Sequence, residues 1–327
     1  MGATQRPPRY EDASIVADIG GTHARFARWT ASGLDAFARY DNDDFAELPA
    51  LIDHYRGRAA PAARQALLAF AVPVGPGDMR MTNRDWTFSA EGLRAALGLS
   101  RLRVVNDFVA AAAGLGGLAP HERTPIGGSA RSEGTTVVLG PGTGLGAAAI
   151  ARIDGREHVI ASEAGHMSAA VSDTLARSAY ERAHRRFGRV SWERLLCGDG
   201  LALFDATARD AGDARAPAAV AAAALAGDAP ALRAAGAFAY TLGEFAGDVA
   251  LAFGATGGVY LTGGVLKGLG EAFDTAALRA GFEDKGRFRA LLREVPCLRV
   301  DADDLALRGL ARILAGAVSA PIVEAVG

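Results

Sequence analysis

Two glycine-rich turns are the parts of this 327-residue sequence whose residue types are best suited to chemistry. The first lies in ADIGGTHARF (17–26) and the second in LGPGTGLGAAA (139–149), each between two apolar runs. Glycine allows a turn to expose consecutive backbone N–H groups, and such a concave backbone binds anions, above all phosphate. The hydroxyl groups of Thr22 and Thr143 add one donor to each turn. One such turn is most often a plain hairpin, but two together favour a phosphate site.

A carboxylate and a third pair of glycines extend this pattern. Asp18 precedes the first turn; it cannot attract a phosphate, but it can hold Mg²⁺, directly or through water, which then bridges to phosphates. The alternative is that Asp18 only caps the turn. Gly263 and Gly264 follow another apolar run. The sequence has no GxxxxGK[ST] and no GxGxxG that opens a helix after a strand, which argues against a P-loop and a Rossmann dinucleotide site.

An amide and a carboxylate, Asn106 and Asp107, stand between two apolar runs in VVNDFVAA (104–111). One interpretation is local: Asp107 caps the helix predicted after it, and Asn106 closes a turn. The other is that the pair contacts a substrate, with Asp107 as a general base. Both can hold, because a capping position keeps a side chain rigid. The phosphate turns elsewhere in the chain favour the second interpretation.

The elements that must position these residues are predicted from apolar runs and turn residues. Residues 14–29 are typical of two strands around the first glycine turn, and residues 66–75 and 102–105 predict two further buried strands. The alanine-rich residues 172–252 favour packed helices. Both glycine turns share one plan, strand, turn with threonine, strand, which suggests an internal duplication. A stretch rich in Gly, Pro and Ser at 116–134 indicates a boundary between two lobes.

The composition narrows the classes of function. The length suits two packed lobes, and the net charge of -2 gives no support for nucleic-acid binding or for attachment to an acidic membrane. We expect neither a membrane span nor a signal peptide, because no apolar run is long enough and the first residues are polar. No CxxC pair exists, so we expect Cys197 and Cys297 to be small core residues of a cytoplasmic protein.

Eight segments, taken in order, resemble those of the bacterial glucokinase family, in the actin, hexokinase and sugar-kinase ATPase superfamily. They extend over nearly the whole chain and are ADIGGTHARFA, MTNRDWTFS, VVNDFVAAA, GPGTGLGAA, EAGHMS, WERLLCGDGL, GGVYLTGGV and FEDKGRF. The related ROK sugar kinases and repressors usually carry a CxCGxxGC zinc motif, which is absent here. The resemblance is therefore to the non-ROK glucokinases.

The resemblance implies an α/β chain with the two-lobed actin-like ATPase (ribonuclease H-like) fold and a cleft between the lobes. We expect residues 11–117 plus 305–327 to form a small lobe, and residues 118–304 to form a large lobe with helical insertions. ATP would lie between the two phosphate turns, accompanied by Mg²⁺. The resemblance also implies a homodimer.

The resemblance assigns roles residue by residue. The nucleotide-binding residues it implies are Asp18, Gly20, Gly21, Thr22, Gly140, Gly142, Thr143, Gly144, Gly263 and Gly264, with Asp18 also serving Mg²⁺. The sugar-binding residues it implies are Asn106, Asp107, Glu163, His166 and Glu193, with Asp107 as catalytic base. These types suit a hexose, which offers hydroxyl groups and no charge and is held by carboxylates, amides and imidazoles. Residues 284–287 (DKGR) within the FEDKGRF segment are expected to be a surface turn with paired charges and no chemical role.

Some assignments have structural alternatives, and the sequence departs from the family pattern in three places. His166 could be a structural histidine and Glu193 could lie on a solvated helix face. His23 stands where the family commonly has Asn, and Ser162 and Ala164 stand where it has glycines around the glutamate. CGDGL (197–201) replaces the usual SGPGL, which could loosen that turn.

The resulting prediction is an ATP:D-hexose 6-phosphotransferase that acts first on glucose. In this reaction Asp107 draws the proton from the 6-hydroxyl group, which attacks the γ-phosphorus. One alternative is a kinase for another hexose, such as fructose or mannose. A second is a sugar-responsive regulator on the same scaffold, which would need a DNA-binding domain before the first strand. A third is an actin-like ATPase, whose turnover sugar would not stimulate.

Overall fold

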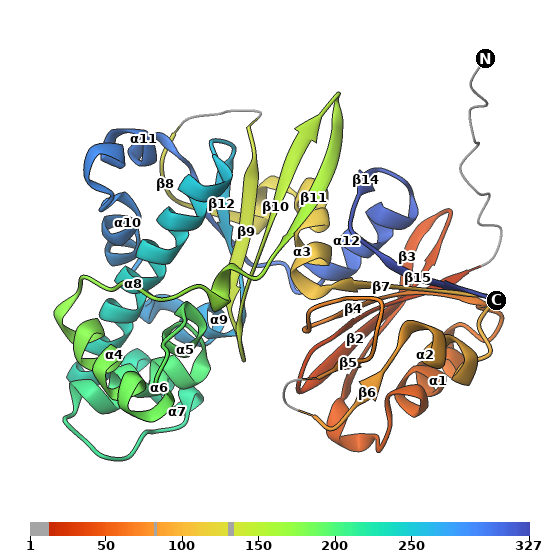
Figure 1. Cartoon of the computed structure of the whole chain (residues 1–327), viewed down its shortest axis with the longest axis horizontal. Helices are drawn as coiled ribbons and strands as arrows, with labels where there is room; N and C mark the ends of the chain where they lie inside the picture. The colour runs from red at the N-terminus through yellow and green to blue at the C-terminus, as the bar shows by residue number, and fades with distance from the viewer. Residues whose placement is uncertain (1–12, 82–83, 130–133) are drawn as a thin grey trace. The chain divides into compact units, whose positions relative to one another are not determined.

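The computed structural model of the chain describes residues 13–81, 84–129 and 134–327 (Figure 1). Thr82 and Asn83 of the MTNRDWTFS segment lie outside the described residues. The described chain divides into two compact units. The first unit comprises the described residues up to Leu118, Ile153–Ala161 and Ala302–Gly327, and the second comprises Ala119–Arg152 and Ser162–Asp301.

The first unit is built on a sheet with the strand order β15-β7-β4-β1-β2-β3. Its strands are β1 (Ser14–Ile19), β2 (His23–Thr30), β3 (Gly33–Asp41), β4 (Gln65–Phe70), β7 (Arg101–Asn106) and β15 (Val323–Val326). Two short pairs accompany it, β5 (Met79–Arg80) with β6 (Thr87–Phe88), and β11 (Arg156–Ser162) with β14 (Val318–Ser319). The strands predicted around the first glycine turn and before Asn106 are confirmed.

The parallel strands β1, β4 and β7 end at one edge of this sheet. Their register places Ile19 beside Phe70, and Phe70 beside Asn106. The first glycine turn follows β1 and the Asn106-Asp107 pair follows β7, so both lie at the same edge with β4 between them. Neighbouring strands lie about 4.8 Å apart, so roughly 10 Å separates the two strand ends.

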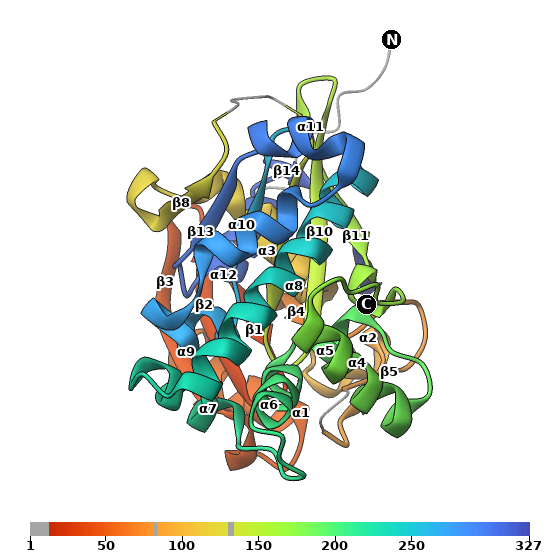
Figure 2. The ribbon, with the colours of Figure 1, turned by 90° about the vertical axis from the view of Figure 1, so that its left-hand side faces the viewer.

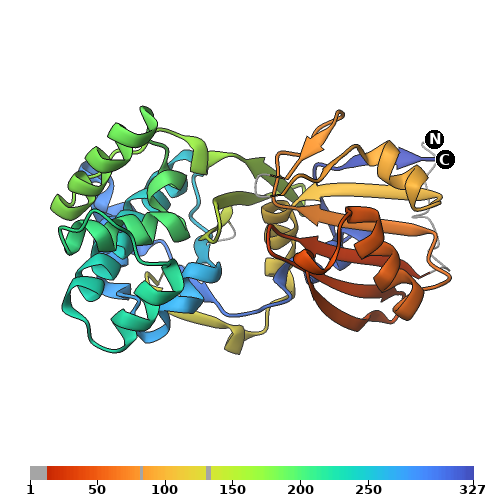
Figure 3. The same ribbon diagram turned by 90° about the horizontal axis from the view of Figure 1, so that it is seen from below.

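Helices cover both faces of this sheet. They are α1 (Leu48–Ala59), α2 (Ala90–Ala96), α3 (Asp107–Gly114) and α12 (Leu305–Leu314). Helices α1 and α2 pack against the face that carries Ile15, Ala17 and Ile19, and α1 lies across the strands in Figure 3. Helices α3 and α12 cover the opposite face (Figure 1). Ser89 caps α2, since its hydroxyl group accepts from Gly92 N at 3.0 Å.

Two glycines let α3 and α12 approach until their backbones touch. A Cβ atom on Gly309 of α12 would overlap the carbonyl oxygen of Ala110, and a Cβ atom on Gly114 of α3 would overlap that of Leu305. Only glycine fits at either position. The contact fixes the axis of α3, and with it the helix start that carries Asn106 and Asp107.

The second unit has its own mixed sheet, with the strand order β10-β9-β12-β13-β8. Its strands are β8 (Arg123–Gly127), β9 (Thr136–Pro141), β10 (Leu145–Ile153), β12 (Gly258–Leu261) and β13 (Cys297–Val300). Its helices are α4 (Thr174–Phe187), α5 (Trp192–Leu195), α6 (Gly198–Ala208), α7 (Pro217–Leu225), α8 (Ala229–Phe253), α9 (Gly264–Leu269), α10 (Thr275–Glu283) and α11 (Arg289–Glu294). The prediction of packed helices in the alanine-rich region is confirmed.

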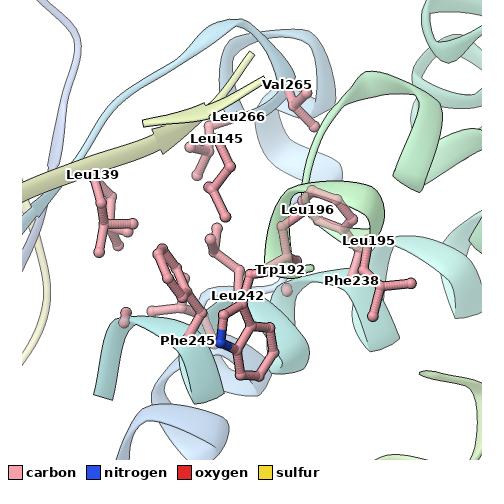
Figure 4. Packing of buried hydrophobic residues seen from close by; sticks show 14 of the residues in the cluster. Leu139, Leu145, Trp192, Leu195, Leu196, Phe238, Leu242, Phe245, Val265 and Leu266 are labelled. Carbon is pink, nitrogen blue, oxygen red and sulfur yellow. The ribbon is translucent and has the colours of Figure 1, made fainter. Parts of the chain in front are cut away.

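Helix α8 is the centre of the second unit's core. Trp192, Phe238 and Phe245 pack there with leucines from β9, β10 and α5 (Figure 4). Helix α10 lies along α8 (Figure 2), because Gly243 and Gly281 let the two backbones touch. No single helix of the described chain is long and apolar enough to cross a membrane. The pair α7 and α8 passes that test only when taken together, with a 110° bend between them, and most of α8 is core.

The turn 284–287 follows the end of α10 at Glu283, and its Asp284 and Lys285 are paired, as expected. Lys285 Nζ lies 2.7 Å from Asp248 on α8, and Asp284 accepts from Tyr240 and contacts Arg289. The segment therefore ties the α10–α11 connection to α8.

The glycine contact between α3 and α12 predicts the effect of a single methyl group. We expect Gly309→Ala to lower the free energy of unfolding by about 1–3 kcal/mol, because the new Cβ atom meets a backbone oxygen that cannot move alone. Gly57→Ala is the matched control, since a Cβ atom at that position in α1 would meet nothing within 4 Å. It should raise stability by up to about 1 kcal/mol through helix propensity. Urea unfolding measures both; equal effects would contradict the close contact.

Candidate functional site

The first glycine turn is held by hydrogen bonds to its carbonyl groups. Gly20 O accepts from Asn42 Nδ2 at 2.8 Å, Gly21 O from Arg84 Nε at 3.1 Å, and Thr22 O from Asn42 N at 2.9 Å. Within the described part of the chain, the N–H groups of Gly21 and Thr22 have no acceptor. Thr22 is exposed. The turn therefore has its carbonyl groups occupied and two N–H groups available, as an anion site requires.

Asp18 lies at the end of β1, opposite Arg25 of β2. Arg25 Nη1 donates to Asp18 Oδ2 at 3.2 Å, and the Asp18 side chain is only 17% exposed. Burial raises the pKa of Asp18 above its usual range, and Arg25 opposes this shift. Asp18 therefore pairs with a guanidinium group, and its contact with Arg25 is a structural role that the sequence did not predict.

The residues around Asp18 can hold Mg²⁺ only if phosphate oxygens and water supply most of its ligands. Among residues 13–81, 84–129 and 134–327, no three His, Cys, Asp or Glu side chains are close enough to hold a metal ion. Mg²⁺ is commonly bound through one or two carboxylates, with phosphate oxygens and water completing its shell. Asp18 can serve as that one carboxylate, but the described residues offer no metal site made of protein ligands alone.

Asn106, and not Asp107, is the cap of α3, which corrects one interpretation of the sequence. Asn106 Oδ1 accepts from Phe108 N at 2.9 Å and from Val109 N at 3.3 Å, while its Nδ2 donates to Val72 O at 3.2 Å. Asp107 is the first residue of the helix, and its Oδ1 accepts from Phe108 N at 2.9 Å. Asn106 is the cap because its backbone is extended and it is the residue just before the helix. The carboxylate then sits in the first turn, where the helix dipole stabilises negative charge.

In the second unit Glu163, His166 and Glu193 form one cluster. His166 Nε2 lies 3.9 Å from Glu163 Oε2, and His166 Nδ1 lies 3.9 Å from Glu193 Oε1. Glu163 and His166 are more than half exposed, whereas Glu193 is 29% exposed. Burial raises the pKa of Glu163, nearby Glu193 adds to the shift, and His166 opposes it. The two acids and the imidazole thus present a polar, open set of donors and acceptors.

Backbone pairing brings the two segments of this cluster together. Trp192 N donates to Met167 O at 3.0 Å, and Ala169 N donates to Val190 O at 3.1 Å. Arg189 Nη2 also donates to His166 O at 2.8 Å. These bonds place the start of α5, which carries Glu193, beside the turn that carries His166.

Glu193 also reaches the second glycine turn. Its Oε2 accepts from Leu145 N at 2.9 Å, and a Cβ atom on Gly144 would overlap this oxygen. Gly198 N donates to Gly142 O at 2.9 Å, so the CGDGL segment holds the turn. In the part of the chain that the structure describes, the N–H groups of Thr143 and Gly144 have no acceptor. This turn therefore also has two backbone N–H groups available, as the first turn does.

The third pair of glycines lies against the second turn. A Cβ atom on Gly140 would overlap Thr262 O, and one on Gly263 would overlap Pro141 O. Gly263 also has a φ of 112°, which L side chains rarely adopt. The structure thus brings Gly140 and Pro141 of the second turn against Thr262 and Gly263.

Residues that depart from the family pattern make local contacts in the structure. Ser162 Oγ accepts from Ala164 N at 3.1 Å, and Ala164 is buried. His23 Nε2 lies 3.8 Å from Asp41. Cys197 Sγ accepts from Gly200 N at 3.4 Å and caps α6, so the turn before α6 keeps a cap.

Sequence reasoning missed Asn42 and Arg84, the two residues that hold the first turn. Neither stands in a glycine turn, and the contacts join residues 22 and 63 positions apart. The one available signal was that Arg84 lies within the MTNRDWTFS segment.

Comparison with known proteins gives one family. The model of the family described as Glucokinase matches residues 15–317. A protein of Aromatoleum aromaticum named Glucokinase is 41% identical over 93% of this chain and 95% of its own length. The "Bifunctional protein glk" of Burkholderia lata is 40% identical over 93% of this chain and 49% of its own length, so the chain spans about half of that relative. A solved glucokinase from an Antarctic psychrotroph is 30% identical, with a TM-score of 0.78 over 93% of this chain and 99% of that one.

Proposed function

This chain belongs to the glucokinase family, and from that premise we propose that it transfers the γ-phosphoryl group of ATP to the 6-hydroxyl group of D-glucose. Its fold is the two-lobed actin-like ATPase fold expected from the sequence. The observation that carries the proposal is the common sheet edge in the first unit. The available N–H groups of Gly21 and Thr22 follow β1, and the carboxylate of Asp107 follows β7. These two strands end at the same sheet edge with β4 between them.

Asp107 is proposed as the general base. Its carboxylate takes the proton of the 6-hydroxyl group as that oxygen attacks the γ-phosphorus and ADP leaves. A positioned base typically contributes about 10²–10⁴ in rate. The separation of roughly 10 Å between the ends of β1 and β7 leaves room for a phosphoryl group and the attacking hydroxyl group.

The glycine turns are proposed to hold the nucleotide. In the first unit the N–H groups of Gly21 and Thr22, beside Gly20, would donate to phosphate oxygens. In the second unit the donors would be Thr143 and Gly144, supported by Gly140 and Gly142. Gly263, which lies against this turn, and the adjacent Gly264 would contact the adenosine part. Asp18 would hold Mg²⁺ through water, because Arg25 already pairs with one of its oxygens. Bound Mg²⁺ neutralises phosphate charge during phosphoryl transfer.

The sugar is proposed to be held by Asn106, Asp107, Glu163, His166 and Glu193. Carboxylates accept from hydroxyl groups, and the imidazole both accepts and donates. Asn106 has less to offer than the sequence suggested, because its Oδ1 already accepts twice and one Nδ2 hydrogen goes to Val72 O. Its remaining Nδ2 hydrogen can donate to one hydroxyl group. Glu193 likewise has one oxygen committed to Leu145 N, which leaves Oε1 for the sugar.

A homodimer and a cytoplasmic location are also proposed. The homodimer rests on the family resemblance. The location is supported by Cys197 and Cys297, which are free and buried thiols in the second unit.

The proposal predicts that sugar drives nucleotide turnover. We expect ADP release from MgATP by the wild-type chain to depend on glucose, with glucose giving the highest kcat/KM in a panel of hexoses. A site built to hydrogen-bond each hydroxyl group rejects analogues that lack one. A higher kcat/KM for fructose or mannose would favour a different hexose kinase. Turnover that glucose does not change would contradict the proposal and favour a sugar-independent ATPase.

The raised pKa of Glu163 predicts an effect of pH on sugar use. The ionised carboxylate accepts from hydroxyl groups, and burial makes it take up a proton at a higher pH than an ordinary glutamate. The kcat/KM for glucose should therefore fall as the pH decreases through this raised pKa. Glu163→Gln should lower kcat/KM and move the acid limb of its pH profile to lower pH, because the amide does not titrate.

The control for this experiment is Glu181→Gln, which replaces an exposed glutamate of α4 in the same unit. It should leave the pH profile unchanged. An acid limb at the same pH in wild type and Glu163→Gln would assign that limb to another group.

A further inference from the structure

Arg84 lies between the short strands β5 and β6 and is fixed from three directions. Its Nε donates to Gly21 O at 3.1 Å, its Nη2 pairs with Asp43, and its guanidinium group lies 4.8 Å from the centre of the Trp86 ring. The Arg84 side chain is only 15% exposed. A side chain held this way loses little further entropy when it positions another group.

The groups that hold Arg84 are themselves anchored in the first unit. Trp86 Nε1 donates to Ala46 O at 3.1 Å, and Asp43 N donates to Asp41 Oδ1 at 3.0 Å. Asp43 belongs to the short helix that starts at Asn42, which holds the neighbouring Gly20 carbonyl group. Arg84 thus connects Asp43 and Trp86, which are held by hydrogen bonds of their own, to one peptide group of the glycine turn.

That connection determines where one N–H group points. The peptide bond is planar and trans, so the carbonyl group of Gly21 and the N–H group of Thr22 point in opposite directions. Asn42 fixes the Gly20 carbonyl group and so directs Gly21 N–H; Arg84 fixes the Gly21 carbonyl group and so directs Thr22 N–H. Gly21 has no Cβ atom to restrict its own backbone rotation, so Arg84 supplies a restraint on this peptide that the glycine does not.

We propose that Arg84 is a positioning residue for nucleotide binding: it holds the peptide between Gly21 and Thr22 so that Thr22 N–H faces the phosphates. The inference rests on the proposed role of the first turn in binding ATP. A different role, direct attraction of phosphate by the charge of Arg84, is disfavoured because Asp43 pairs with that charge.

The test is the equilibrium affinity for MgATP without sugar, measured by titration calorimetry. Arg84→Ala should weaken MgATP binding about tenfold, the value of one hydrogen bond from a charged donor. Arg84→Lys should also weaken it, because an ammonium group lacks the planar fork that holds Asp43 and Gly21 O together. The affinity for glucose without nucleotide should stay unchanged in both variants. Arg80→Ala is the control, since Arg80 is 73% exposed on the same pair of short strands.

Asp43→Asn separates positioning from charge by the sign of its effect. If Arg84 positions the turn, loss of Asp43 loosens Arg84 and weakens MgATP binding about twofold to threefold, the value of an exposed ion pair. If Arg84 attracts phosphate directly, loss of the opposing charge tightens MgATP binding.

Several results would overturn the proposal: unchanged MgATP affinity in Arg84→Ala, wild-type affinity in Arg84→Lys, tighter binding in Asp43→Asn, or a parallel loss of glucose affinity. Arg84→Lys keeps the charge and most of the side chain, so the test remains if Arg84→Ala does not fold. A wild-type chain that binds MgATP but does not phosphorylate glucose would contradict the glucokinase proposal alone. The Arg84 series would still be decided by MgATP binding.

Discussion

The parallel register of β1, β4 and β7 positions the residues that are proposed to act in the first unit. It brings the glycine turn after β1 and the Asn106-Asp107 pair after β7 to one edge of a single sheet. Helix α3 then starts at that edge, and its glycine contact with α12 fixes its direction. A shift of one residue in this register would turn Asp18 toward the face that carries Ile15, Ala17 and Ile19. It would also move Asp107 away from the first glycine turn.

In the second unit, close contacts between backbone segments position the second glycine turn. Gly140, Gly144 and Gly263 each lie where a Cβ atom would overlap a neighbouring segment. Through these contacts the second turn meets the β12–α9 connection on one side and Glu193 on the other. Because Glu193 also faces His166, the proposed sugar cluster and the proposed nucleotide turn share one carboxylate. Binding at one of them is therefore expected to affect the other.

Local patterns in the sequence predicted the strands around the first glycine turn and before Asn106, the glycine turns and the helices of the alanine-rich region, because neighbouring residues determine each of these. The family resemblance brought Glu163, His166 and Glu193 into one set, and the structure places them together. The sequence did not predict the pairing of Asp18 with Arg25 or the roles of Asn42 and Arg84. These depend on contacts between segments distant in the chain, which no local pattern encodes. Asp107 was wrongly considered as the cap, since the choice between adjacent Asn and Asp depends on the backbone angles at the helix start.

Asp107→Asn tests whether Asp107 takes a proton at the edge of the first unit's sheet, as proposed. The substitution keeps size and polarity but removes the base. The measurement is the single-turnover rate of glucose phosphorylation at saturating MgATP and glucose, with the Kd of each ligand measured separately. If Asp107 is the general base, the rate should fall by about 10²–10⁴ while both Kd values stay close to those of the wild type. A rate near that of the wild type in Asp107→Asn would contradict this role.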